Sequence, residues 1–173
     1  YKENILGSKN LFFSSHKYNP KLKFIFANSS QIFKKKKGTV TENSEKKIAK
    51  DYTKFYTKFR IEFDKFMLNQ NVNYTCLIFF NHDSMYRSKK FLFPRLVNAI
   101  KKRNKKFVNE ILNYNIHGDF SHADDICKAI YKTILTKKRI KRLILSSNIC
   151  TAINDIVKFV IQKNKINIKL NFN

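Results

Sequence analysis

Glycine, proline and tryptophan are scarce in this sequence. Its 173 residues include three glycines, two prolines and no tryptophan. Linkers between domains are usually rich in glycine, proline or serine. Because no such stretch interrupts the chain, and no internal repeat occurs, the sequence predicts a single domain spanning residues 1–173.

Cysteine is also sparse, and its spacing argues against two kinds of covalent framework. Cys76, Cys127 and Cys150 are odd in number and far apart, without a Cys-x-x-Cys or Cys/His ligand pattern. Neither a disulfide scaffold nor a metal site is therefore predicted, and a reducing, cytoplasmic compartment is the simpler expectation. No apolar stretch approaches the ~20 residues of a membrane span, and no signal peptide is recognisable.

Acidic residues are few: 12 Asp and Glu stand against 36 Lys and Arg, a net charge of +24. One interpretation is a protein that binds nucleic acid or another anionic polymer through the runs Lys34–Lys37 and Lys101–Lys106. The other is a mutational bias towards codons rich in A and T, which also enriches Asn, Ile and Phe. We favour the bias, because most of the positive charge is Lys, whereas nucleic-acid sites draw strongly on Arg.

Hydrophobic residues make up 43% of the chain, enough for a folded core. Strand-like and helix-like patterns alternate along it. The expected strands are 23–27, 74–80, 143–145 and 166–170, and the expected helices are 48–68, 91–102, 124–135 and 151–162. This alternation predicts an α/β fold in which helices cover both faces of a parallel sheet.

The segment Phe79–Ser84, FFNHDS, is the most informative motif. It ends an apolar, β-branched and aromatic run, so a buried strand stops abruptly at Asn-His-Asp-Ser. Ligands of open α/β sheets bind at the carboxyl ends of the strands. Two further polar groups are expected near such ends: Asn28–Gln31 after the first strand, and Tyr52 on the helix that follows. The three groups are expected to converge on one crevice.

Four segments have the order and spacing of motifs in a known enzyme family. They are YKENILGSKNLF (Tyr1–Phe12), KFIFANSSQIF (Lys23–Phe33), LIFFNHDSMYRSKKF (Leu77–Phe91) and GDFSHADDI (Gly118–Ile126). Together they resemble the GDP-mannose 4,6-dehydratase family of the extended short-chain dehydrogenases/reductases, which are NAD-dependent epimerases and dehydratases. The resemblance implies a partial Rossmann-like, doubly wound sheet with a small carboxyl-terminal part that binds substrate.

The resemblance implies a role for each catalytic position. Ser29 falls where the family has the Ser or Thr that hydrogen-bonds the sugar C4 oxygen, and Tyr52 falls on the catalytic Tyr. Gln31 falls where the dehydratases have the Glu that removes the C5 proton, which an amide cannot do. Tyr56 stands in place of the family's Lys, one helical turn beyond the Tyr. Tyr56 with Arg60 restores a Tyr-x-x-x-cation pattern four residues out of register.

Binding residues are implied in the same way. Ser30 and Asn81 are expected to contact a nucleotide sugar, with GDP-mannose as the expected substrate. Gly118 stands where the family has an Arg that meets the substrate. The cofactor is expected to be NADP rather than NAD. The residues expected to contact it are Tyr52, Tyr56, His82 and Arg87.

The family reaction converts GDP-mannose to GDP-4-keto-6-deoxymannose, with loss of water and a hydride relay through NADP. The three glycines of this chain form no Gly-rich strand–helix turn, so the chain resembles the carboxyl-terminal portion of such an enzyme. With Gln31 and Tyr56 also departing from the pattern, we expect impaired dehydratase activity. A nucleotide-sugar epimerase or 4-keto reductase, which needs no Glu base, is the alternative. The helix of Tyr52 is expected to pair subunits in a homo-oligomer.

Overall fold

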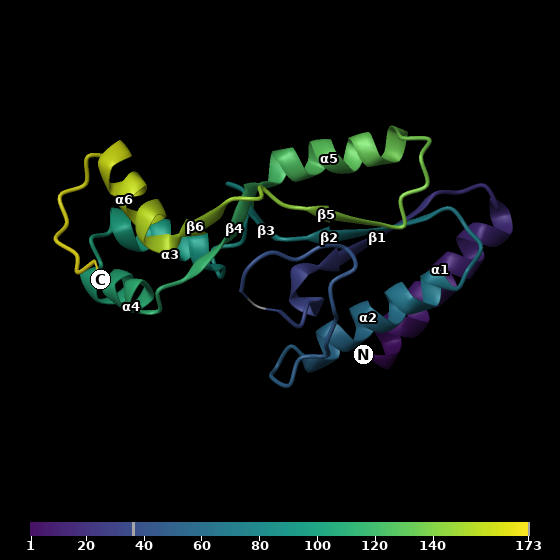
Figure 1. The fold of residues 1–173 in the computed structure, drawn as a ribbon. Coiled ribbons are helices and arrows are strands. Elements are labelled where there is room, and N and C mark those ends of the chain that lie inside the picture. Colours follow the sequence, from purple (N-terminus) through teal and green to yellow (C-terminus); the bar gives the residue numbers. More distant parts are fainter. Residues whose placement is uncertain (36, 173) are drawn as a thin grey trace. The chain divides into compact units, whose positions relative to one another are not determined.

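A computed structural model of the chain describes residues 1–35 and 37–172 (Figure 1). Lys36, within the basic run Lys34–Lys37, and Asn173 lie outside the described residues. The chain divides into two compact units, the first made of Tyr1–Phe80 and Ala129–Leu145, and the second of Asn81–Lys128 and Ser146–Asn173. No helix in the described part of the chain is both long and apolar enough to cross a membrane.

The first unit is built on a parallel sheet of three strands in the order β1-β2-β5. Their bounds are β1 Phe24–Ser29, β2 Tyr74–Phe79 and β5 Arg142–Leu145. Helices α1 and α2 cover one face of the sheet and α5 covers the other (Figure 1). The helices span α1 Lys2–Tyr18, α2 Lys54–Leu68 and α5 Ala123–Leu135, of which residues 129–135 belong to this unit. The predicted α/β fold, a parallel sheet between helices, is confirmed.

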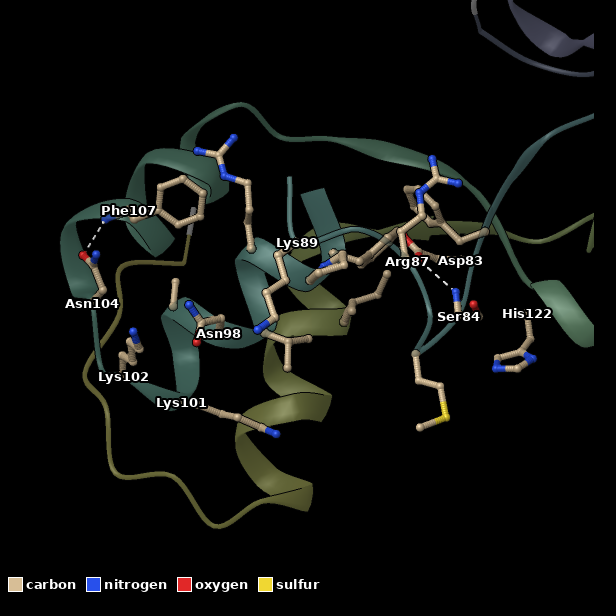
Figure 2. Close-up of a pocket in the computed structure, with 18 of the residues that line it drawn as sticks. Asp83, Ser84, Arg87, Lys89, Asn98, Lys101, Lys102, Asn104, Phe107 and His122 are labelled. Atoms are coloured by element: carbon tan, nitrogen blue, oxygen red, sulfur yellow. Dashed lines mark hydrogen bonds between the residues drawn. The ribbon is translucent and has the colours of Figure 1, made fainter. Parts of the chain in front are cut away.

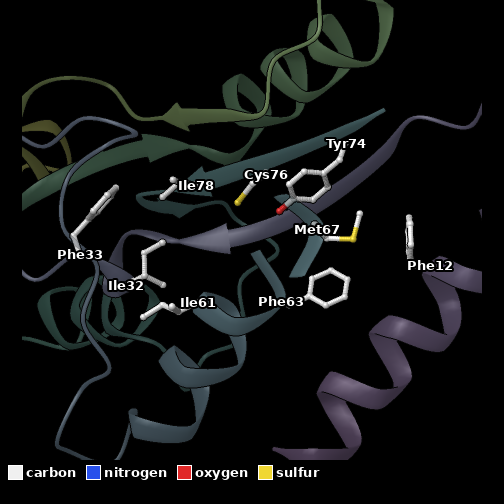
Figure 3. Packing of buried hydrophobic residues seen from close by; sticks show 9 residues of the cluster. All are labelled: Phe12, Ile32, Phe33, Ile61, Phe63, Met67, Tyr74, Cys76 and Ile78. Carbon is white, nitrogen blue, oxygen red and sulfur yellow. The ribbon is translucent and has the colours of Figure 1, made fainter. Parts of the chain in front are cut away.

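Aromatic side chains fill the core between α1, α2 and the sheet (Figure 3). Phe12 of α1 meets Phe24 of β1 and Phe66 of α2 edge-on, with ring centroids 5.5 and 5.9 Å apart. Phe63 is fully buried, and its ring lies 4.7 Å from that of Phe26. Each such ring pair adds about 0.5–1.5 kcal/mol beyond the burial of its area. The cluster therefore stabilises the packing of both helices on the sheet.

Helix α2 begins later than the sequence predicts. The apolar spacing indicates a helix from about residue 48, but the Asp51 carboxylate accepts hydrogen bonds from the backbone N–H of Thr53 (2.8 Å) and from its hydroxyl (2.5 Å). This local turn competes with helical hydrogen bonding, so the helix begins only at Lys54. The prediction that Tyr52 lies on the helix is therefore wrong: Tyr52 lies in the turn that precedes it.

A buried ion pair joins α2 to the sheet. Arg142 of β5 donates two hydrogen bonds to Oδ2 of Asp64, from Nε at 3.0 Å and from Nη2 at 2.7 Å. Tyr74 of β2 donates its hydroxyl to Oδ1 of the same carboxylate at 3.0 Å. The Asp64 side chain is only 1% exposed, and that of Arg142 is 20% exposed. Burial raises the pKa of Tyr74 and raises the pKa of the Cys76 thiol to about 12, so both groups are neutral near pH 7.

The second unit holds a smaller, mixed sheet in the order β3-β4-β6, in which β3 is parallel and β6 antiparallel to β4. The strands are β3 Asn81–Asp83, β4 His117–His122 and β6 Cys150–Ala152. The helices of this unit include α3 Leu92–Lys101, α4 Lys105–Asn113 and α6 Ile153–Lys163. Its core is formed by buried residues of these helices, namely Leu96, Ala99, Ile100, Val108, Leu112, Ile153 and Val157.

The second unit contains most of the elements that the sequence does not predict. Strands β3 and β6 have only three residues each, and β4 is largely polar, so the residue pattern shows neither an apolar run nor a clear alternation. The predicted strand 166–170 is wrong, because Ile166 and Leu170 pack on the helical core and the segment pairs with no strand of the described chain. That residues 1–173 make one partial domain stays a prediction.

Replacing Asp64 by Asn should lower the free energy of unfolding by about 3–5 kcal/mol, because the Arg142 guanidinium is left largely buried without a carboxylate. The matched control is Glu45→Gln, which removes the charge of an exposed ion pair with Lys34 and should cost less than about 1 kcal/mol. Urea denaturation followed by circular dichroism measures both. Equal losses in the two variants would show that the buried pair has no special role.

Candidate functional site

The carboxyl end of β1 holds the polar residues expected to act on a sugar. Asn28 is buried, and its Oδ1 accepts a hydrogen bond from the Ser29 backbone N–H at 2.8 Å. The Ser29 hydroxyl oxygen accepts from the Gln31 N–H at 3.3 Å and so caps the short 3₁₀ helix Ser30–Ile32. Ser29 and Ser30 are half-buried and Gln31 is exposed. The strand end thus presents hydroxyl and amide groups without a carboxylate.

Arg60 joins α2 to this strand end. The Arg60 guanidinium donates a hydrogen bond to the Ala27 carbonyl of β1. The backbone carbonyl of Arg60 accepts a hydrogen bond from Nδ2 of Asn28 at 3.5 Å. The same guanidinium lies 4.5 Å from the ring centroid of Tyr56. The Tyr-x-x-x-cation pattern is therefore realised through the ring face, by a cation–π contact. Tyr52 is 97% exposed, outside the helix. The structure thus links Tyr56, through Arg60, to the strand that carries Ser29.

The second unit holds the remaining predicted residues on its sheet. Asn81 and His82 lie on β3, and Gly118 lies on the neighbouring strand β4. The Asn81 side chain donates to the Asp119 carbonyl at 3.3 Å. Because the predicted residues divide between the two units, their convergence on one crevice stays a prediction.

The position of Gly118 has a steric explanation in the second unit. A Cβ at this position would lie 2.9 Å from Cζ of Phe120. The Phe120 ring in turn meets Phe93 edge-on, with centroids 5.0 Å apart. The absence of a side chain at residue 118 therefore makes room for an aromatic pair, and an Arg of the family type would displace it.

A pocket of about 1210 Å³ lies within the second unit. The loop after β3, helix α3, the start of α4 and the end of β4 provide most of its lining. Figure 2 shows one end of the pocket with Asp83, Ser84, Arg87 and His122, and the other end with Lys101, Lys102 and Asn104. Lys89 lies between the two ends (Figure 2).

The pocket is strongly positive and carries aromatic surface. Its charged lining consists of the cations Arg87, Lys89, Arg95, Lys101 and Lys102 and the single carboxylate of Asp83. The Arg87 guanidinium lies 3.8 Å from the ring centroid of Phe91, which orients it, while its Nε is buried without a hydrogen-bond partner among the described residues. Arg95 lies 4.8 Å from the ring of Phe107 in the same way. Guanidinium groups held on aromatic rings are suited to bind phosphate.

Arg87, which the resemblance assigns to the cofactor, lines this pocket, and its role stays a prediction. Sequence reasoning did not single out Lys89, Arg95 or the aromatic members of the pocket. Lys89 and Arg95 follow the Asn-His-Asp-Ser motif closely, and Arg95 lies on the polar side of a helix whose apolar side was recognised. The recurrence of cations at residues 87, 89 and 95 was the available signal. What the sequence did not indicate is that Phe107 and Phe120, from other elements, complete the same pocket.

The described residues of this chain do not form a complete cofactor or metal site. Gly7 lies within α1, Gly38 in a loop at φ 75°, and Gly118 in β4. None of these three glycines lies in a short turn that leads directly from a strand into a helix, where bare backbone can approach a pyrophosphate; Gly38 lies in the long connection between β1 and α2. No group of three or more His, Cys, Asp or Glu in residues 1–35 and 37–172 could hold a metal ion.

The parallel sheet between helices, with polar residues at a strand end, places the chain in the Rossmann-like class of α/β proteins. Residues 1–145 match the family described as "NAD dependent epimerase/dehydratase family", and the chain belongs to that family. A search of curated proteins found no match.

Solved structures of this class share the fold at low sequence identity. A dTDP-glucose 4,6-dehydratase from Bacillus anthracis in complex with NAD is 16% identical, with a TM-score of 0.75 over 100% of this chain and 56% of that one. RMD from Pseudomonas aeruginosa, complexed with NADPH, is 12% identical, with a TM-score of 0.78 over 98% and 59%. A UDP-N-acetylglucosamine 4-epimerase from Methanobrevibacter ruminantium is 16% identical, with a TM-score of 0.72 over 100% and 57%. The chain thus spans little more than half the length of these proteins.

Replacing Gly118 by Ala should destabilise the protein by about 1–2 kcal/mol, because the new methyl group and the Phe120 ring cannot occupy the same space. The matched control is Gly7→Ala on α1. No atom lies within 4 Å of the added Cβ there, so a gain of about 0.5–1 kcal/mol is expected from the higher helix propensity of Ala. Chemical denaturation of both variants measures the difference. Stabilisation by Gly118→Ala would contradict the steric explanation.

Proposed function

We propose that this chain is part of a nucleotide-sugar-modifying enzyme that resembles GDP-mannose 4,6-dehydratase. The observation that carries the proposal is the family match over residues 1–145. The reaction proposed for an intact enzyme of this kind is conversion of GDP-mannose to GDP-4-keto-6-deoxymannose with loss of water. An epimerase or a 4-keto reductase acting on another nucleotide sugar is equally consistent with the family.

The pocket of the second unit supports a nucleotide-sugar substrate. Arg87 and Arg95 offer guanidinium groups to phosphate oxygens, and Phe93 and Phe120 offer apolar surface to a base or sugar ring. Two structural neighbours were solved with such ligands, a UDP-glucuronic acid 4-epimerase from Bacillus cereus with UDP-glucuronic acid, and MoeE5 with UDP-glucose. We assign Asn81, Ser30 and Gly118 to the substrate side of the site on the resemblance alone.

The catalytic residues that we propose are Ser29 and the two tyrosines Tyr52 and Tyr56. Of the tyrosines, Tyr56 has the stronger support, because Arg60 stacks on its ring and is anchored to β1. Gln31 has an amide where a base is needed to remove the C5 proton, so we propose that water elimination is impaired. An epimerase or reductase needs no such base, and Gln31 is the observation that favours this second candidate.

We propose NADP as the cofactor, with NAD as the less favoured choice. On the resemblance alone, Tyr52, Tyr56, His82 and Arg87 are the residues assigned to it, but the pocket favours the substrate phosphate as the partner of Arg87. A bound nicotinamide cofactor would supply hydride chemistry. The residues present do not form a site for the pyrophosphate of that cofactor, so we assign no hydride-transfer step to them. A homo-oligomer formed through α2 is also proposed. Phe55 of that helix is 62% exposed and offers an apolar contact.

Replacing Arg87 by Gln should weaken the binding of GDP-mannose by roughly tenfold or more, because a charge-assisted hydrogen bond to phosphate is lost. The matched control is Arg139→Gln, an exposed arginine of the first unit that does not line the pocket. Isothermal titration calorimetry at moderate ionic strength measures both affinities. The assignment of the pocket would be abandoned if the two variants bound GDP-mannose equally well, or if the unaltered protein did not bind it.

In an intact enzyme with a complete cofactor site, Gln31→Glu should raise water elimination if that enzyme is a dehydratase, because a carboxylate at this position can accept the C5 proton. The intact enzyme and its Gln31→Glu variant are each incubated with NADP and with GDP-mannose, UDP-glucose or UDP-glucuronic acid, and products are identified by mass spectrometry. A product lighter than GDP-mannose by about 18 mass units, the mass of one water molecule, marks dehydration. Conversion to an epimer in the unaltered protein, with no dehydration in Gln31→Glu, would instead establish the second candidate.

A further inference from the structure

The turn between α3 and α4 carries a dense positive charge. Five of its six residues, in the sequence Lys-Lys-Arg-Asn-Lys-Lys from Lys101 to Lys106, are basic, and all six are exposed. None of the five forms an ion pair with a carboxylate of the described residues. Their mutual repulsion is therefore not relieved by a carboxylate of the chain itself.

The turn also departs from the usual preferences of helix ends. Arg103 has a φ of 54°, a left-handed conformation that is uncommon for residues other than glycine. Lys105 and Lys106 occupy the first turn of α4, where the helix dipole disfavours positive charge and where no acidic residue is present. Local conflicts of this kind concentrate at functional sites. An anion bound to the turn would oppose both the repulsion and the unfavourable dipole.

Backbone hydrogen bonds hold the turn in its shape. The N–H of Arg103 donates to the Ile100 carbonyl at 3.0 Å, and the N–H of Asn104 donates to the Ala99 carbonyl at 2.9 Å. The Asn104 side chain caps α4 by accepting from the Phe107 N–H at 3.2 Å. Because Ala99 and Ile100 belong to the buried core, the basic residues are presented from a fixed support.

The turn forms one end of the pocket. Lys101, Lys102 and Asn104 line it at the end that lies away from Arg87 (Figure 2). A nucleotide-sugar diphosphate carries about two negative charges, whereas the lining holds five cations and one carboxylate. The volume of about 1210 Å³ also exceeds the ~300–1,000 Å³ of common ligand pockets. A diphosphate bound near Arg87 would therefore leave unpaired positive charge and free volume at the opposite end of the pocket.

We propose that the turn Lys101–Lys106 is a phosphate-binding site, which takes a further phosphate of a ligand at the end of the pocket opposite Arg87. The proposal rests on the proposed function only for the ligand at the Arg87 end. The substrate class that it names is a nucleotide with a phosphate group in addition to its diphosphate. Lys101 and Lys102 would contact that phosphate, and Arg103 and Lys105 would contribute to the positive potential around it.

The test uses inorganic tripolyphosphate as the probe on the full chain. Chemical shifts of backbone amides should move at residues 101–107, in addition to shifts around Arg87, during a nuclear magnetic resonance titration. The double variant Lys101→Gln/Lys102→Gln should weaken binding about tenfold, because two charge-assisted contacts are lost. The matched control Lys137→Gln/Lys138→Gln removes two exposed, adjacent lysines of the first unit and should change affinity by less than about twofold at moderate salt.

Three results would overturn the phosphate site. One is an absence of shifts at the turn, and another is equal weakening in the two double variants, which would indicate only non-specific attraction. The third is binding of a short single-stranded RNA to the same amides that tripolyphosphate cannot displace, which would make the turn a nucleic-acid site. Failure of GDP-mannose to bind, with tripolyphosphate still bound at the turn, would count against the proposed function alone.

Discussion

The buried carboxylate of Asp64 is the constraint on which the first unit depends. It lies on α2 and receives hydrogen bonds from Arg142 of β5 and Tyr74 of β2, so one side chain ties a helix to two strands. Removing a charge from such an arrangement leaves its partner unpaired in a medium of low polarity. The same helix carries Tyr56 and Arg60, and its alignment with the sheet therefore determines where Arg60, stacked on Tyr56, meets β1.

A different physical principle organises the second unit. Its sheet is short, and its stability comes from apolar residues packed among three helices. Cationic side chains lie at the surface of this core and line a pocket, in which Asp83 is the single carboxylate. Guanidinium groups are oriented by aromatic rings rather than by carboxylates, so their charge stays available to an anionic ligand. This is consistent with the phosphate-bearing substrate that we propose.

Much of the fold could be predicted because its main elements have clear periodicities. The apolar run 74–80 predicted β2, and the helical spacing over 124–135 predicted α5. Strands β3, β4 and β6 could not be predicted in this way, since their residues form neither an apolar run nor a clear alternation. The misplacement of Tyr52 has a local cause: an apolar pattern continues through a turn that the Asp51 carboxylate stabilises.

The sequence alone determined the family resemblance, the alternation of strands and helices, and the polar groups at two strand ends, because these are properties of residue order. Only the tertiary structure decided which groups meet. It stacked Arg60 on Tyr56, placed the Phe120 ring beside Gly118, and gathered cations from the loop after β3 and from α3 and its C-terminal end around one pocket. Such contacts depend on side chains that the chain brings together only when its apolar surfaces pack, and no local pattern records them.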